Sequence, residues 1–298
     1  MRPAAAGDGV ALRALYSGIS RGTERLVVEG RVPPSEWARM RAPFQEGEFS
    51  FPVKYGYAMV AEILDGPRAG QPVFALYPHQ DQFRLPEADF VALPKDIPPA
   101  RAVLAANMET ALNILWDSGA GPGDRIAIVG AGVVGALTGY LAARLPGAEV
   151  TLVDPQPKIA LATALGCGFA EPDAARGECD VVIHASASAA GLALAMDLAG
   201  MEAVVVEASW HGTGQTPVPL GGAFHSRRLK LVSSQVGAVP PARAARWTYR
   251  RRLEMALSLL ADPALDALIS GETGFADLPS AYVDILSAPQ TLCHRIRY

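Results

Sequence analysis

The glycine spacing that follows one apolar run constrains the fold of this chain more than any other feature. Ile126–Val129 is a short, wholly apolar run, and Gly130, Gly132 and Gly135 follow it in the spacing G-x-G-x-x-G. Beyond the glycines, apolar residues recur at helical spacing and share one face; they are Val134, Leu137, Leu141 and Leu145. A buried strand that passes through a glycine turn into a helix is typical of the opening of a βαβ unit.

Apolar strand-like runs continue to alternate with helical stretches along the middle of the chain. The later runs are Val150–Val153, Val181–Ile183, Ala203–Val206 and Leu229–Val232. Fully apolar strands that alternate with helices indicate a parallel sheet covered on both faces. We therefore predict an α/β fold with a doubly wound parallel-sheet domain over residues 111–239.

The region before this domain is rich in turn residues and short strands. Val10–Tyr16 alternates apolar and polar positions with a period of two, as a half-buried strand does. Further strand-like runs lie at Tyr57–Leu64 and Pro72–Tyr77, and Ser35 is placed to cap a short helix that ends at Met40. We predict a β-rich domain over residues 1–110.

The last part of the chain is expected to return to this β-rich domain. Residues 240–298 contain a helical stretch near Ala244–Leu260 and a strand-like end at Leu292–Tyr298. A further helix is predicted between the two domains, with Asn107 as its N-cap.

Composition excludes several classes of protein. The chain carries 26 Lys and Arg against 30 Asp and Glu, and a pI near 5.8 argues against a nucleic-acid partner. Ile126–Ala143 is uncharged for 18 residues, but its glycines argue against a membrane span. Met1–Asp8 lacks the apolar core of a secretory signal, and the three cysteines are too scattered for a disulfide framework or a metal site. We expect a cytoplasmic protein without a membrane or nucleic-acid partner.

The glycine loop predicts a dinucleotide site. The first glycine permits a tight turn, the second lets the backbone approach a pyrophosphate, and the third allows close packing of helix and strand. The N–H groups at the start of the helix, near Val133 and Val134, would face the phosphates. The alternative is a parallel sheet with purely structural glycines and no nucleotide.

An acidic residue after the second strand bears on the choice of cofactor. Asp154 follows Gly135 by 19 residues, where a carboxylate would bind both ribose hydroxyls and repel a 2′-phosphate. We therefore expect NAD rather than NADP. Lys158 could pair with a phosphate or lie along the adenine, and the alternative role for Asp154 is a turn residue before Pro155.

The order of the domains and two short motifs resemble the medium-chain dehydrogenase/reductase superfamily, which includes zinc alcohol dehydrogenases and quinone oxidoreductases. The motifs are Gly18–Glu24 and Lys54–Ala58, and the resemblance implies a GroES-like fold for the β-rich domain. At the family's zinc-ligand positions this chain has Ser20 (or Arg21), Tyr57 and, near the third, Ala106. Neither Ser nor Tyr is a usual zinc ligand, so we expect no zinc.

Without zinc, the candidate catalytic residues are hydroxyls and histidines. Tyr57 has an ordinary pKa near 10, so it would act as a proton donor, unless it only fills the space of the metal. Thr23 resembles a relay hydroxyl of zinc members, with a structural turn as the alternative. His79 and His211 lie in loops and could line the site or be exposed. His184 is interpreted as structural.

The remaining site predictions concern the substrate and the nicotinamide. Ser20 is a candidate for the substrate, Trp210 could cover the nicotinamide or the substrate, and Arg21 could reach the pyrophosphate or the substrate. Family position implies that Glu109 and Thr110 lie near the nicotinamide. A basic stretch is interpreted as a solvated helix face; it comprises Arg243, Arg246, Arg250, Arg251 and Arg252.

The sequence therefore predicts a zinc-independent, NAD(H)-linked oxidoreductase that acts on a small or medium organic carbonyl, alcohol or enone. Ser17–Glu24, followed by Gly30 and Pro33-Pro34, is similar to bacteriochlorophyllide dehydrogenases, so the alternative substrate is a hydroxyethyl side chain of a tetrapyrrole. The third possibility is a catalytically silent nucleotide-binding sensor or partner protein. A homodimer is expected by analogy alone.

Overall fold

The computed structural model describes residues 9–298 and divides into two compact units. Unit 1 contains the chain up to Ala106 together with Leu253–Tyr298, and unit 2 is Asn107–Arg252. Met1–Asp8, for which no secretory signal is predicted, lies outside the described residues. The two units are described separately below.

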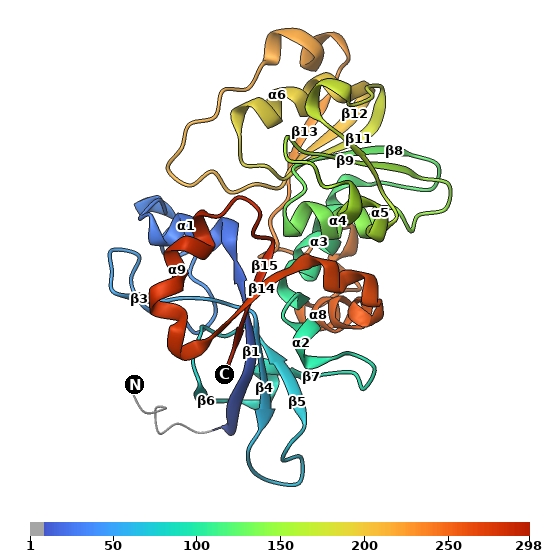
Figure 1. Cartoon of the computed structure of the whole chain (residues 1–298). Coiled ribbons are helices and arrows are strands. Elements are labelled where there is room, and N and C mark those ends of the chain that lie inside the picture. Colours follow the sequence, from blue (N-terminus) through green and yellow to red (C-terminus); the bar gives the residue numbers. More distant parts are fainter. Residues whose placement is uncertain (1–8) are drawn as a thin grey trace. The chain divides into compact units, whose positions relative to one another are not determined.

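Unit 2 is built on a six-stranded sheet, coloured green to orange in Figure 1, in which every neighbouring pair is parallel. Its strands in spatial order are β10 (Gly168–Ala170), β9 (Glu149–Val153), β8 (Arg125–Val129), β11 (Cys179–His184), β12 (Ala199–Glu207) and β13 (Lys230–Ser233). The first strand, β8, lies in the middle of the sheet, and β9 and β10 follow on one side of it. The chain then crosses back to β11, and β12 and β13 follow on the other side. This doubly wound order confirms the predicted fold class, and its switch point lies between β8 and β11.

Helices connect these strands. They are α4 (Val133–Ala142), α5 (Ile159–Leu165) and α6 (Ala189–Leu198), with short helical turns at η3 (Pro172–Ala174) and η4 (Leu220–Phe224). α4 packs on β8 and β9, and α6 packs on β11 and β12. A side chain at Gly139 of α4 would come within 2.6 Å of Leu152 on β9, so this glycine permits the close approach of helix and sheet.

The long apolar run is divided between a strand and a helix. Ile126–Ala143 supplies most of β8, the glycine loop, α4 and the residue after it. Within residues 9–298, no helix combines the length and the apolar character needed to cross a bilayer.

Two predictions about helices near the edges of unit 2 were wrong. α3 (Ala105–Ser118) begins before Asn107, which is buried inside the helix and is not its N-cap. The single helix expected near Ala244–Leu260 is split into α7 (Pro241–Ala244) and α8 (Tyr249–Ser258). The break occurs because the Thr248 hydroxyl accepts a hydrogen bond from the Arg251 N–H at 3.1 Å and caps a new helix.

Unit 1 is built on a seven-stranded sheet. Six strands follow the order β14 (Ile269–Gly274), β15 (Cys293–Arg297), β1 (Val10–Ser20), β4 (Met59–Ile63), β5 (Pro72–Ala75) and β7 (Phe90–Ala92), and β6 (Gln82–Leu85) also pairs with β1. A separate hairpin joins β2 (Glu46–Gly47) to β3 (Val53–Lys54). The predicted strands are confirmed, and β1 extends to Ser20 because it pairs with three neighbours.

Short helices surround this sheet. They are α1 (Arg21–Val28), α2 (Pro99–Ala102) and α9 (Leu278–Ser287), with 3₁₀ turns at η1 (Pro34–Glu36), η2 (Glu87–Asp89), η5 (Leu259–Ala261), η6 (Pro263–Leu268) and η7 (Phe275–Asp277). The helix expected from Ser35 to Met40 is only the 3₁₀ turn η1, which Pro34 begins.

The C-terminal return is an integral part of unit 1. β15 pairs with β1 over Tyr16–Ser20, and Ile19 packs with Ile296, Ile285 and Leu286. This pairing brings Tyr282 and Tyr298 to the end of β1, where Figure 1 shows the red C-terminal segment beside the blue N-terminal one.

Gly130→Ala should destabilise unit 2. Gly130 has φ of 105°, and a side chain there would meet the Ser186 backbone nitrogen at 2.7 Å. Backbone strain and the clash together should lower the free energy of unfolding by roughly 2 kcal/mol or more. Urea unfolding would measure this loss.

Gly121→Ala is the matched control, because no atom outside its neighbours lies within 4 Å of the added methyl group. Equal stability of the two variants would contradict the close approach of the loops that follow β8 and β11.

Candidate functional site

The glycine loop of unit 2 contains two crowded glycines and one open glycine. A Cβ added at Gly130 would lie 2.7 Å from the Ser186 backbone nitrogen, and a Cβ added at Gly135 would lie 2.0 Å from the Gly130 carbonyl oxygen. At Gly132, nothing in the chain lies within 4 Å of an added Cβ. Gly132 is also the N-cap of α4 and has no capping side chain, so the first N–H groups of the helix, near Val133 and Val134, face this space. Such a helix start fits a phosphate.

The acidic residue beside this loop is held by the chain itself. Asp154 accepts hydrogen bonds from the Ala131 N–H at 2.8 Å, from Lys158 Nζ at 3.1 Å and from the Gln156 N–H at 2.9 Å. Lys158 also donates to the Ala131 carbonyl at 3.0 Å. Asp154 is therefore in place beside the loop, but Lys158 offsets the negative charge that the cofactor prediction relied on.

Three hydroxyls that were predicted separately lie together in unit 1. The Tyr57 hydroxyl is hydrogen-bonded to the side chains of Ser20 and Thr23. Ser20 ends β1 and Thr23 lies in the first turn of α1, which Arg21 begins. Burial raises the pKa of Tyr57 to about 12, against the effect of the two hydrogen bonds. Tyr57 is therefore protonated at neutral pH and can donate a proton.

A buried carboxylate lies behind these hydroxyls. Glu24 is 1% exposed; it accepts from the Ser20 N–H at 2.8 Å and from the Tyr282 hydroxyl at 2.5 Å. His79 Nε2 lies 3.1 Å from the same carboxylate and must donate to it, since a carboxylate only accepts. Burial opposes ionisation, but His79, Tyr282 and Ser20 together hold the pKa of Glu24 below its usual value. Glu24 is therefore an anion inside unit 1.

The buried network continues beyond His79. His79 Nδ1 lies 2.8 Å from the Ser17 hydroxyl, which lies 2.9 Å from the Tyr298 hydroxyl. Gly56 has φ of 118°, and a side chain there would overlap the His79 ring at 2.9 Å. The predicted catalytic residue His79 is thus hydrogen-bonded through both ring nitrogens, to Ser17 and to Glu24.

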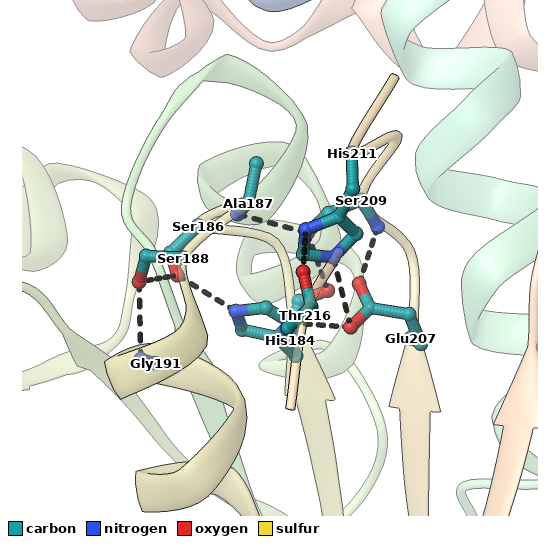
Figure 2. Close-up of polar contacts among 9 residues, drawn as sticks. All are labelled: His184, Ser186, Ala187, Ser188, Gly191, Glu207, Ser209, His211 and Thr216. Carbon is teal, nitrogen blue, oxygen red and sulfur yellow. Dashed lines mark hydrogen bonds and ion pairs between the residues drawn. The ribbon is translucent and has the colours of Figure 1, made fainter. Parts of the chain in front are cut away.

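The predicted loop residue His211 joins a second polar cluster, at the carboxyl ends of β11 and β12 in unit 2 (Figure 2). His184 and Glu207 are direct register partners on these strands, and His184 Nδ1 lies 2.6 Å from Glu207 Oε2. His211 Nε2 lies 3.4 Å from the same oxygen. We call these three residues the strand-end cluster. Trp210 is the half-buried neighbour of His211 in the same loop.

The remaining predicted residues lie on α3. Glu109 is buried and pairs with Arg252 Nε at 2.9 Å, and Arg252 also donates to Asn113 at 2.5 Å. Burial raises the pKa of Glu109 even though Arg252 lowers it. The prediction of a solvated basic face was therefore wrong for Arg252, which is 2% exposed because Glu109 and Asn113 pair with it. Thr110, the next residue, is half-buried.

Several residues of these clusters were missed by sequence reasoning. Glu24 had a local signal, because it ends the Gly18–Glu24 motif that the sequence analysis singled out. Tyr282 and Tyr298 had none, because they lie 258 and 281 residues from the groups they contact. His184 and Glu207 end adjacent strands, but only the register makes them partners.

The chain was also compared with known proteins. No protein-family model matches it, and no curated protein sequence matches it. Solved structures match along nearly the whole chain. L-idonate 5-dehydrogenase from Escherichia coli superposes with a TM-score of 0.76 and 16% identity, covering 98% of this chain and 91% of that one. 2R,3R-butanediol dehydrogenase from Bacillus subtilis gives 0.74 and 15%, covering 100% and 94%.

A third structure carries a nucleotide. It is provisionally described as a zinc-binding dehydrogenase, comes from Sinorhizobium meliloti and is bound to NADP. Its TM-score is 0.75 at 19% identity, with 98% of this chain and 93% of that one covered. The chain shares its fold with these dehydrogenases. At these identities the similarity concerns the fold alone.

Glu24→Gln should lower stability in a pH-dependent manner. The pKa of Glu24 is lower in the folded chain than its unfolded value near 4.5, so its ionisation stabilises the fold above that pH. The stabilisation is lost as the pH falls through the lower, folded pKa. The difference in thermal midpoint between wild type and Glu24→Gln should therefore be largest near neutral pH and shrink under acid conditions.

The exposed Glu171→Gln variant serves as the control and should match wild type throughout. A gap between wild type and Glu24→Gln that stays constant with pH would show that Glu24 is not a buried anion.

Proposed function

We propose that this protein is a nicotinamide-dependent oxidoreductase whose unit 2 binds the cofactor. The observation that carries the proposal is the open glycine, Gly132, at the start of α4 and beside the switch point of a doubly wound sheet. The similarity to dehydrogenase folds, one of them bound to NADP, supports it. Such a cofactor supplies or accepts a hydride.

We propose a specific set of residues to hold the cofactor. The N–H groups near Val133 and Val134 would bind the pyrophosphate, and Asp154 would accept from the adenosine ribose. Arg21 and Thr110 are further candidates carried over from the family resemblance. We propose NAD as the favoured cofactor because the Asp154 carboxylate would accept from the ribose hydroxyls, although Lys158 beside it would reduce the repulsion of a 2′-phosphate.

The family's zinc position does not fit a metal in this chain. The corresponding residues are Ser20, Tyr57 and Ala106, which offer two neutral hydroxyls and a methyl group in place of thiolates and imidazole. We infer that the reaction at this place proceeds without zinc.

Tyr57 is the proposed proton donor. Burial and the nearby Glu24 anion together raise its pKa to about 12, so the hydroxyl is kept protonated. A protonated hydroxyl can donate to a carbonyl oxygen that gains negative charge, and Ser20 and Thr23 can pass a proton to it. Glu24 and His79 hold this group in position. This arrangement favours reduction of a carbonyl or an activated C=C bond, with oxidation of an alcohol as the reverse reaction.

Filling the open glycine should abolish cofactor binding without unfolding the chain. Gly132 has φ of −72°, which valine adopts, and nothing in the described chain lies within 4 Å of the added Cβ, which would enter the space proposed for the pyrophosphate. Gly132→Val should weaken NADH binding at least tenfold, measured by NADH fluorescence, while the thermal midpoint stays unchanged. Wild type should bind NADH more tightly than NADPH.

Gly121→Val is the matched control for added bulk at an open glycine and should bind NADH as wild type does. If wild type bound neither nucleotide, or if Gly132→Val bound both normally, the proposal would fail.

Removing one oxygen from Tyr57 should impair the reaction but not binding. With aldehydes, enones and quinones as test substrates and NADH as donor, Tyr57→Phe should lower kcat by roughly 100-fold, the size of a general-acid contribution. The dissociation constant for NADH should stay unchanged. Tyr16→Phe, on β1 of the same unit, is the control.

Two other results would decide between the alternatives. Normal turnover in Tyr57→Phe would show that Tyr57 only fills space. Tight NADH binding with no turnover of any test substrate would favour a nucleotide-binding sensor over an enzyme.

A further inference from the structure

The strand-end cluster of unit 2 brings three groups of metal-ligand type to one point. One ligand atom from each of His184, Glu207 and His211 lies within 4.8 Å of the other two (Figure 2). His184 and Glu207 are the last residues of β11 and β12, and His211 lies four residues beyond Glu207 in the following loop. The cluster is thus built on the ends of two paired strands, which fix two of the three side chains.

We propose that His184, Glu207 and His211 form a binding site for a divalent transition-metal ion such as Zn²⁺. The ligand atoms would be His184 Nδ1, a carboxylate oxygen of Glu207 and His211 Nε2. Two imidazoles and one carboxylate suit zinc and neighbouring first-row metals, and three protein ligands leave a position for water or another ligand. The site lies in unit 2 and shares no residue with the family's zinc position.

The distances are close to those that a metal requires. Ligand atoms in a tetrahedral zinc site lie about 2.0–2.1 Å from the ion and so about 3.3 Å from one another. In the structure the two rings lie 2.6 Å and 3.4 Å from Glu207 Oε2. Small rotations of the side chains would therefore admit the ion.

In each imidazole, the ring nitrogen that is not a proposed ligand atom (the outer nitrogen) already has a hydroxyl as its hydrogen-bond partner. His184 Nε2 lies 2.7 Å from Ser186 Oγ, and His211 Nδ1 lies 2.8 Å from Thr216 Oγ1. Metal-binding histidines usually donate their other N–H to such a partner, which sets the tautomer and the ring orientation. With the protons on the outer nitrogens, the lone pairs of both inner nitrogens face Glu207.

The partners of these outer groups complete the arrangement. Ser186 Oγ lies 2.9 Å from Ser188 Oγ, which accepts from the Gly191 N–H at 3.0 Å, so Ser186 can donate onward and accept from His184. The other oxygen of Glu207 accepts from the Ser209 N–H at 2.7 Å. This bond fixes the carboxylate and leaves Oε2 for the two rings.

Access and charge also suit an ion. The His184 side chain is fully buried, whereas Glu207 and His211 are 19% and 20% exposed, so the cluster is open on one side only. Without a metal, Glu207 would accept N–H groups from the rings. When an ion binds, each inner N–H proton is released or moves to the outer nitrogen, where a hydroxyl accepts it.

The test uses the full-length protein freed of metal by a chelator and then titrated with Co²⁺ alone. We expect one Co²⁺ per chain, a visible absorption band typical of low-coordinate cobalt, and loss of that band when Zn²⁺ is added. Glu207→Gln and His211→Ala should each weaken Co²⁺ binding at least 100-fold. Thr216→Val, which removes only an outer partner, should weaken it about tenfold.

His225→Ala is the matched control, because His225 is an exposed histidine of unit 2 outside the cluster. It should bind Co²⁺ as wild type does. A folded His211→Ala variant, verified by circular dichroism, that still binds Co²⁺ normally would overturn the proposal, as would wild type without a stoichiometric site. Either result would identify the cluster as a hydrogen-bonded group only.

This inference is independent of the proposed hydride transfer. The Co²⁺ titration is made without nucleotide, and Gly132→Val should bind the metal as wild type does. Loss of NADH binding therefore tests the first proposal, and loss of Co²⁺ binding tests the second.

Discussion

The parallel pairing of β8 with β11 is the constraint on which the rest of unit 2 depends. The strand order reverses at this pair, so the chain leaves the ends of β8 and β11 in loops that meet at Gly130 and Ser186. The close approach leaves no room for a side chain at Gly130, while Gly132 faces open space. The adjacent pairing of β11 with β12 places His184 beside Glu207. One set of backbone hydrogen bonds thus organises both the candidate phosphate site and the strand-end cluster.

Unit 1 is organised by a buried charge. A carboxylate as buried as Glu24 needs hydrogen-bond donors around it, because an unpaired buried anion is strongly destabilising. Of its three donors, the Ser20 N–H is only four residues away in the sequence, whereas His79 and Tyr282 come from 55 and 258 residues away. The same requirement explains why the C-terminal return belongs to this unit. It also keeps the neighbouring Tyr57 protonated, since an anion beside a phenol disfavours its ionisation.

Features that depend on residues close together in the sequence were predicted, and features that depend on residues far apart were not. The strands of unit 2, its glycine loop and Asp154 were predicted, because apolar runs and glycine spacing are local signals. The cluster of Ser20, Thr23 and Tyr57 was predicted only as separate candidates, through a family resemblance. The sequence analysis did not predict that Lys158 pairs with Asp154 and offsets its charge. Arg252 was interpreted as exposed because its partner Glu109 lies 143 residues away in the sequence.

Residue order alone was enough to establish a doubly wound domain with a glycine turn and a β-rich companion, since periodicity and turn chemistry act over a few residues. Only the tertiary structure shows the strand register, the burial of Glu24 and the residues that contact His184. Each of these depends on which side chains are brought together across long separations, and the chemistry of a histidine or a carboxylate is set by its neighbours. From the sequence alone, His184 is interpreted as structural. Beside Glu207 and His211 in the structure, it is a candidate metal ligand.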